Sequence, residues 1–197
     1  MIGAHAAGAY PGIQVSVLPY WQHEETAWRI DIGPSGDIRL LRSSVPVKVA
    51  SRQDASGIQW KLVRETRISV REYDSLVGRL LSLQVASLNA DYSANFSFPA
   101  PDTAVRTVHD DRSITYEPGE GSVVVTHGFN YQLQVSQSDL EVDALLYAPE
   151  SALEQGLPQH PDREQIELFA HALREVVAVT GPVGELSAEA IDSWGSE

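Results

Sequence analysis

Trp28-Arg-Ile-Asp-Ile32 is followed by the turn residues Gly33-Pro-Ser-Gly36 and then by Ile38-Arg-Leu-Leu-Arg42. The first segment alternates apolar and polar residues, which is the period-two pattern of a strand with one buried face. Gly and Pro interrupt regular structure and favour tight turns. The sequence therefore predicts a β-hairpin over these residues, and further elements are predicted on both sides of it.

Residues 13–18 alternate in the same way and predict another strand. A second hairpin is expected from 45–49 and 58–63, which flank turn residues at 54–57. Pro46 has no N–H group to donate to a strand ladder, which favours an edge position for the first of these strands. Beyond the first helix, a second group of strands is expected at 105–108, 113–116, 122–126, 131–135 and 141–147.

An amphipathic helix is predicted at about 70–85. Ser69-Val-Arg-Glu72 fits a capping box, in which the Ser hydroxyl accepts the backbone N–H of Glu72 and the Glu carboxylate reaches back to Ser69. Apolar residues then recur at helical spacing, which predicts that one side of the helix packs on the core. They are Tyr73, Leu76, Val77, Leu80 and Leu81.

A second amphipathic helix is predicted at 163–179, after Pro161. Asp162 is the expected N-cap, with Gln165 three residues further on. Gly181-Pro182 predicts the end of this helix, because Gly supplies a left-handed cap and Pro cannot continue the helix.

The order of strands, helix, strands and helix predicts a single α+β domain with mostly antiparallel sheet, over residues 13–183. Residues 1–12 are expected to form a flexible leader, and 184–197 a short helical turn or a frayed tail. The N-terminus lacks the basic segment and the apolar run of an intact signal peptide, so both a cytoplasmic protein and a mature periplasmic form fit. No apolar run approaches the roughly 20 residues of a membrane span.

The chain carries a net charge of −13, and that charge is unevenly placed. Residues 1–100 hold ten Lys and Arg against nine Asp and Glu, whereas residues 101–197 hold four against eighteen. These balances of +1 and −14 sum to the total of −13. Nucleic-acid binding needs cations that displace phosphate counterions, so the acidic half argues against it. An anionic membrane surface would also repel this half of the chain.

Within the acidic half, no Lys or Arg occurs between Arg112 and Arg163. If an acidic surface docks a basic protein, the best candidates are the carboxylates of this cation-free stretch, and alternation along a strand would place the first three on one exposed face. These candidate partner-binding residues are Asp139, Glu141, Asp143, Glu150 and Glu154.

Catalytic signatures are missing from the sequence. There is no cysteine, and the nucleophile-elbow, P-loop, H-E-x-x-H and EF-hand motifs do not occur. His109-Asp-Asp111 is the densest polar triplet, but neighbours on a strand point to opposite faces, and Asp-Asp is ordinary turn chemistry. His127 follows a predicted strand without an evident partner. We therefore expect no metal, no cofactor and no catalytic residues.

These observations favour an acidic protein-binding module, such as an inhibitor or an immunity-type protein that neutralises a basic enzyme or toxin. A carboxylate-rich surface steers a cationic partner and raises the association rate. Two alternatives stay open. One is an accessory domain that is acidic only for solubility, and the other is a hydrolase that uses a His and carboxylate site.

Overall fold

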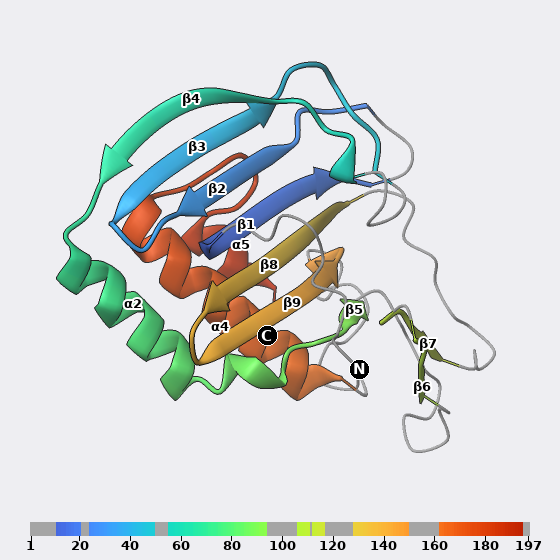
Figure 1. Cartoon of the computed structure of the whole chain (residues 1–197). Coiled ribbons are helices and arrows are strands. Elements are labelled where there is room, and N and C mark those ends of the chain that lie inside the picture. The colour runs from blue at the N-terminus through green and yellow to red at the C-terminus, as the bar shows by residue number, and fades with distance from the viewer. Residues whose placement is uncertain are drawn as a thin grey trace, which may run out of the picture.

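A seven-stranded sheet forms the frame of the fold (Figure 1). The computed structural model describes residues 11–20, 24–49, 55–93, 106–110, 112–116, 128–149 and 162–194. Neighbouring strands pair antiparallel except β5 and β9, which are parallel. Across the sheet, the strands are β4 (Trp60–Arg67), β3 (Asp37–Ser43), β2 (Trp28–Ile32), β1 (Gly12–Pro19), β8 (Phe129–Gln137), β9 (Leu140–Tyr147) and β5 (Asp91–Ser93).

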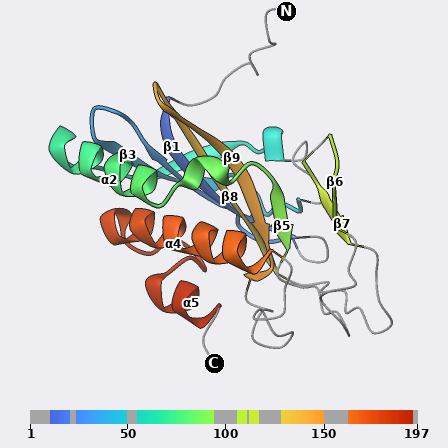
Figure 2. The ribbon, with the colours of Figure 1, turned by 90° about the horizontal axis from the view of Figure 1, so that it is seen from below.

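Helices cover one face of this sheet. Figures 1 and 2 show α2 (Val70–Ser82) and α4 (Arg163–Thr180) on the same side of the strands, with the short helix α5 (Ala188–Ser193) beside α4. A 3-10 turn, η1 (Val85–Ser87), follows α2. A separate hairpin of β6 and β7 lies outside the main sheet (Figure 1). Its strands are β6 (Arg106–Val108) and β7 (Ile114–Tyr116).

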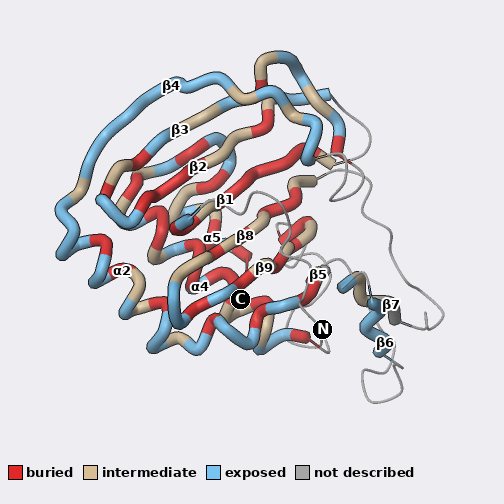
Figure 3. The backbone as a smooth tube through the Cα atoms, viewed as in Figure 1, coloured by how far each residue is buried: buried red, intermediate tan, exposed pale blue. Residues whose placement is uncertain are grey.

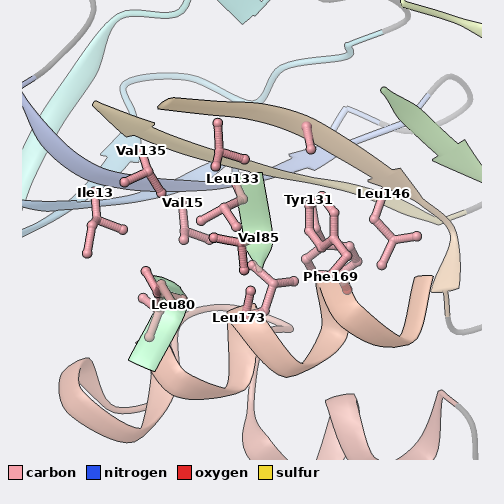
Figure 4. Close-up of a cluster of buried hydrophobic side chains, with 14 of the residues drawn as sticks. Ile13, Val15, Leu80, Val85, Tyr131, Leu133, Val135, Leu146, Phe169 and Leu173 are labelled. Carbon is pink, nitrogen blue, oxygen red and sulfur yellow. The ribbon is translucent and has the colours of Figure 1, made fainter. Parts of the chain in front are cut away.

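The main core lies between the sheet and the helices. In Figure 4, Phe169 and Leu173 of α4 point toward Tyr131 and Leu133 of β8. Burying such side chains contributes about 1.5–3 kcal/mol each, which is why the helices dock on this face. Figure 3 shows the gradient across the sheet: the central strand β1 is buried, whereas the edge strand β4 is exposed along most of its length.

The described part of the C-terminal segment belongs to this core. Leu186, Ile191 and Trp194 are all buried, and the ring centroids of Trp194 and Tyr131 lie 4.8 Å apart. The Ser187 hydroxyl accepts the backbone N–H of Ala190 and so caps α5.

Several sequence predictions are confirmed. The fold is a single α+β domain, and the hairpin of β2 and β3 turns at 33–36 as expected. The capping box is present, because the Ser69 hydroxyl accepts from Glu72 N at 3.2 Å and the Glu72 carboxylate accepts from Ser69 N at 2.8 Å. Gly181 ends α4 as expected with a positive φ of 78°, although its ψ of 175° lies outside the left-handed helical region of the predicted cap.

Three local predictions differ from the structure in whole or in part. Residues 45–49 form no strand and contribute one isolated bridge between Glu25 and Val47, because β4 takes the place beside β3 directly. The sequence predicts no strand between the first helix and residue 105, yet β5 follows η1 and pairs parallel with β9. Asp162 is the N-cap residue of α4 as predicted, but its side chain makes no capping hydrogen bond, because the carboxylate accepts from the Arg106 guanidinium at 2.6 Å.

Some predictions fall outside the described residues. They concern most of the leader (residues 1–10), the strand at 122–126, Asp111, His127, Glu150 and Glu154. In the part of the chain that the structure describes, no helix is long and apolar enough to cross a membrane.

Candidate functional site

The three described residues of the predicted acidic surface lie at one end of the sheet. Asp139 is exposed in the tight turn between β8 and β9, and Glu141 is exposed on β9. Asp143 follows on the same face of β9 and is half-buried. The expected alternation holds for Glu141 and Asp143, because the intervening residues of β9 are buried, whereas Asp139 lies in the turn and not on the strand face.

Asp143 differs from its two neighbours in having a compensated charge. Arg112 donates from Nη1 to Asp143 Oδ2 at 2.8 Å. Gln132 and Gln134 of β8 both donate from Nε2 to Asp143 Oδ1, at 3.2 and 3.3 Å. A carboxylate held by a guanidinium and two amides has little charge left to attract a partner.

A different acidic site lies at the opposite end of the sheet. Gly12 pairs with Ser136 near the β8–β9 turn, whereas Pro19, at the other end of β1, pairs with Phe129. Beside Phe129 is a cavity of about 450 Å³, which we call the acidic pocket. Its described lining residues are Glu24, Glu25, Thr26, Trp28, Pro46, Phe129 and Glu185.

Four separate segments build the acidic pocket. Trp28 and Phe129 belong to the strands on either side of β1, and both pack against the main core. Glu25 is fixed by paired backbone hydrogen bonds with Val47, which also bring Pro46 to the pocket.

Glu185 enters from the connection between α4 and α5. It sits with Gly184 at the tip of a tight turn that is closed by backbone hydrogen bonds between Val183 and Leu186, at 2.9 and 3.0 Å. Gly184 has a φ of 54° and lies directly against the Trp28 indole. The packing of this turn on the indole therefore places the Glu185 carboxylate at the pocket.

The electrostatics of the acidic pocket favour a cation. Glu24, Glu25 and Glu185 are exposed, and their side chains form no ion pair or hydrogen bond with the described part of the chain. Aromatic rings attract cations through their electron-rich faces, so Trp28 and Phe129 add to the attraction of the carboxylates. Among the described residues, no three His, Asp or Glu side chains are placed to share a metal ion. The carboxylates and aromatic rings that line the pocket can together hold an organic cation such as a Lys or Arg side chain.

A polar cluster lies near β5. Tyr92 is buried and donates to Gln165 Oε1 at 3.3 Å, and Asp162 lies beside it in an ion pair with Arg106. Burial raises the pKa of the Tyr92 hydroxyl, and the Asp162 carboxylate raises it further. The ion pair between Arg106 and Asp162 joins the hairpin of β6 and β7 to the start of α4.

The two described histidines, His109 and His171, give no stronger indication of a chemical site. His109 and Asp110 are exposed in the turn between β6 and β7, where His109 N donates to Ser113 O, so the prediction of a turn is confirmed for these two residues. His171 is exposed on α4.

Sequence reasoning missed the acidic pocket. Glu24-Glu25 was visible as an acidic loop, but Glu185 lies more than 150 positions away in the chain. Comparison with protein-family models found no match, and no curated protein matches the chain. The candidate site therefore rests on the geometry of this chain alone.

Proposed function

We propose that the protein is an acidic binding module that recognises a basic protein by taking a Lys or Arg side chain into the acidic pocket. The observation that carries the proposal is that three carboxylates, which have no ion-pair partner among the described residues, line one cavity together with Trp28 and Phe129. Glu24, Glu25 and Glu185 supply the charge, and the two rings supply a surface for the aliphatic part of the side chain.

The charge of the whole chain supports this proposal. A net charge of −13 attracts a cationic partner over a distance, and such steering raises association rates by about 10- to 1,000-fold at low salt. Asp139 and Glu141 are exposed at the far end of the sheet, so they contribute to the overall field without touching a side chain in the pocket. An inhibitor or immunity-type protein that neutralises a basic enzyme or toxin would work in this way.

The direct test is a titration of the full chain with a peptide of alternating Arg and Gly residues, followed by NMR. We expect the peptide to shift the indole N–H signal of Trp28 and the backbone signals of Phe129 and Glu185. A peptide of alternating Glu and Gly residues is the control and should leave them unchanged.

Two triple variants separate the pocket from general charge, because each removes three carboxylates. The first is Glu24→Gln/Glu25→Gln/Glu185→Gln, and the second is Asp139→Asn/Glu141→Gln/Asp143→Asn. The pocket triple should weaken binding of the Arg peptide by roughly tenfold or more, and the strand triple by much less. Equal losses of affinity would mean that the peptide responds only to the net charge of the protein. A larger loss of affinity in the strand triple would place the binding surface on β9.

The same variants identify a natural partner. A protein captured from a native lysate by the wild type and by the strand triple, but not by the pocket triple, has the expected behaviour. Its capture should weaken at high salt, because exposed charges are screened beyond about 8 Å at physiological ionic strength.

A further inference from the structure

The face of the sheet that lies away from α2 and α4 carries a second cavity, of about 320 Å³, which we call the polar cavity. Its floor consists of side chains from the three central strands, and Ala55, Ser56, Ile58 and Trp60 form one wall. The described lining residues are Gln14, Ser16, Leu18, Arg29, Ala55, Ser56, Ile58, Trp60, Gln132 and Gln134.

Strand register arranges the floor in rows. Gln14 of β1 pairs with Asp31 on one side and with Gln134 on the other, and Gln134 pairs with Asp143 of β9. In the adjacent row, Ser16 lies between Arg29 and Gln132.

The charges at this cavity are already compensated. Arg29 Nη2 donates to Asp31 Oδ2 at 2.8 Å, and the guanidinium carbon lies 5.1 Å from the centre of the Trp60 ring. At the other end of the row, Arg112 neutralises Asp143. A charged ligand would lose its hydration and find no free counterion, so the cavity favours an uncharged one.

The glutamines fix the hydrogen-bonding character of the cavity. Gln14 Nε2 donates to Asp31 Oδ1 at 2.8 Å, and Gln132 and Gln134 donate to Asp143 Oδ1. An ionised carboxylate only accepts hydrogen bonds, so each amide must turn its NH₂ group toward it. The three amide oxygens accept no hydrogen bond from the described residues. The lining therefore presents three acceptors to a ligand that brings donors.

Arg29 adds a hydrogen-bond donor to this set of acceptors. Its Nε atom is buried and has no hydrogen-bond partner among the described residues. A ligand that satisfies both the amide oxygens and this donor must carry groups that donate and accept, and the hydroxyl group does both. Leu18, Ile58 and Trp60 provide the apolar part of the wall, against which the C–H face of a ring can lie.

We propose that the polar cavity binds a neutral saccharide of one or two sugar rings. Small-molecule pockets measure about 300–1,000 Å³, so this cavity is at the small end of the range. A sugar combines an uncharged ring, several hydroxyl groups and an apolar C–H face. This site is on the opposite face of the sheet from the helices and is independent of the acidic pocket.

The test uses the full chain and a panel of neutral mono- and disaccharides, with glucosamine and glucuronate as charged controls. Side-chain amide signals of Gln14, Gln132 and Gln134 are followed by NMR. We expect saturable shifts with at least one neutral sugar, and binding weaker by roughly tenfold or more for both charged sugars. Absence of shifts with every neutral sugar, or stronger binding of a charged sugar, would overturn the proposal.

The variant Gln132→Met/Gln134→Met removes two acceptors while keeping the side-chain length. It should weaken binding of the sugar by roughly tenfold or more. Gln59→Met is the matched control, because Gln59 is exposed and does not line the cavity, and it should bind as the wild type does. Retained binding in the double variant would also overturn the proposal. Binding of the Arg peptide to the acidic pocket should be the same in both variants, so the two proposals fail separately.

Discussion

Gly184 packs directly against the indole of Trp28. A Cβ atom added at position 184 would lie 2.5 Å from Trp28 Cδ1 and 2.9 Å from Trp28 Nε1. Cβ atoms in real proteins essentially never come this close to another non-bonded heavy atom. The positive φ of Gly184 adds a second restriction, because residues with a side chain rarely adopt it. This contact couples the turn that carries Glu185 to the strand that carries Trp28.

Gly184→Ala should therefore destabilise the fold by about 1–3 kcal/mol, because the backbone is strained and the indole is displaced. Gly78→Ala is the matched control, since a Cβ at this position in α2 meets nothing within 4 Å. The control should stabilise the protein by about 0.5–1 kcal/mol through the higher helix propensity of Ala. Urea unfolding of both variants measures the difference, and equal effects of the two changes would contradict this account.

Asp143 and Glu141 should differ in their effect on stability although they share a face of β9. Glu141→Gln is expected to change the free energy of unfolding by less than about 0.5 kcal/mol, as surface substitutions usually do. Asp143→Asn replaces an acceptor that serves Arg112, Gln132 and Gln134, and it should cost about 0.5–1.5 kcal/mol, a range that allows for partial exposure. Thermal and urea unfolding of the two single variants compare them, and the reverse order would be evidence against the described network.

Asp162 should contribute more to the stability of the fold than an exposed carboxylate does. It is only 6% exposed and accepts from Arg106 Nε at 2.6 Å. Asp162→Ala is expected to cost about 1–3 kcal/mol, less than for a fully buried pair, because Arg106 is one-third exposed and regains water. A double-mutant cycle with Arg106→Met isolates the coupling between the two side chains, and a coupling near zero would contradict the ion pair.

Asp162→Ala should also change the titration of Tyr92, which can be followed by spectroscopy. Removing the Asp162 carboxylate should lower the pKa of Tyr92, because that charge disfavours the tyrosinate. The pKa should stay above the ordinary tyrosine value, since burial is the larger cause of the shift and is unchanged. An NMR titration of the Tyr92 ring follows this change.

Glu72 should make the fold sensitive to acid. Hydrogen bonds from the Ser69 backbone N–H and hydroxyl lower the pKa of this carboxyl in the folded state. A lowered folded pKa stabilises the protein above the unfolded pKa, and this contribution is lost as the pH falls through the folded value.

Glu72→Gln keeps the shape of the capping box but cannot titrate. The stability difference between wild type and Glu72→Gln should therefore be largest near neutral pH and shrink as the pH drops below about 4.3. Urea unfolding across this range measures it, with Glu141→Gln as the comparison outside a cap. A difference that grows toward acid would show that the sign is wrong.

Short-range patterns in the sequence predicted much of the fold. The period-two alternation of 13–18 and 28–32 gave the strands, and Ser69 with Glu72 gave the start of α2. These features depend on residues within a few positions of one another, so they can be recognised before the tertiary structure is known. The absence of cysteine from the sequence also excluded disulfides and cysteine nucleophiles.

Longer-range relationships escaped sequence reasoning. Asp162 is a residue type that favours the N-cap position, but its carboxylate binds Arg106, 56 positions earlier in the chain. The segment at 45–49 has the pattern of a strand, yet β3 already has β2 and β4 as neighbours. In both cases a distant segment competed with the local preference and prevailed, because strand pairing and charge pairing depend on topology.

The candidate sites divide in the same way. The sequence by itself determined that the chain is acidic, that Glu141 and Asp143 share a strand face, and that Asp139 precedes them. Only the tertiary structure decided that Arg112 neutralises Asp143. It also decided that Glu24, Glu25 and Glu185 line one pocket. The same holds for the three glutamines that turn their amide oxygens away from carboxylates. The physical reason is that charge and hydrogen bonding act through space, and the sheet register brings together residues that the chain keeps far apart.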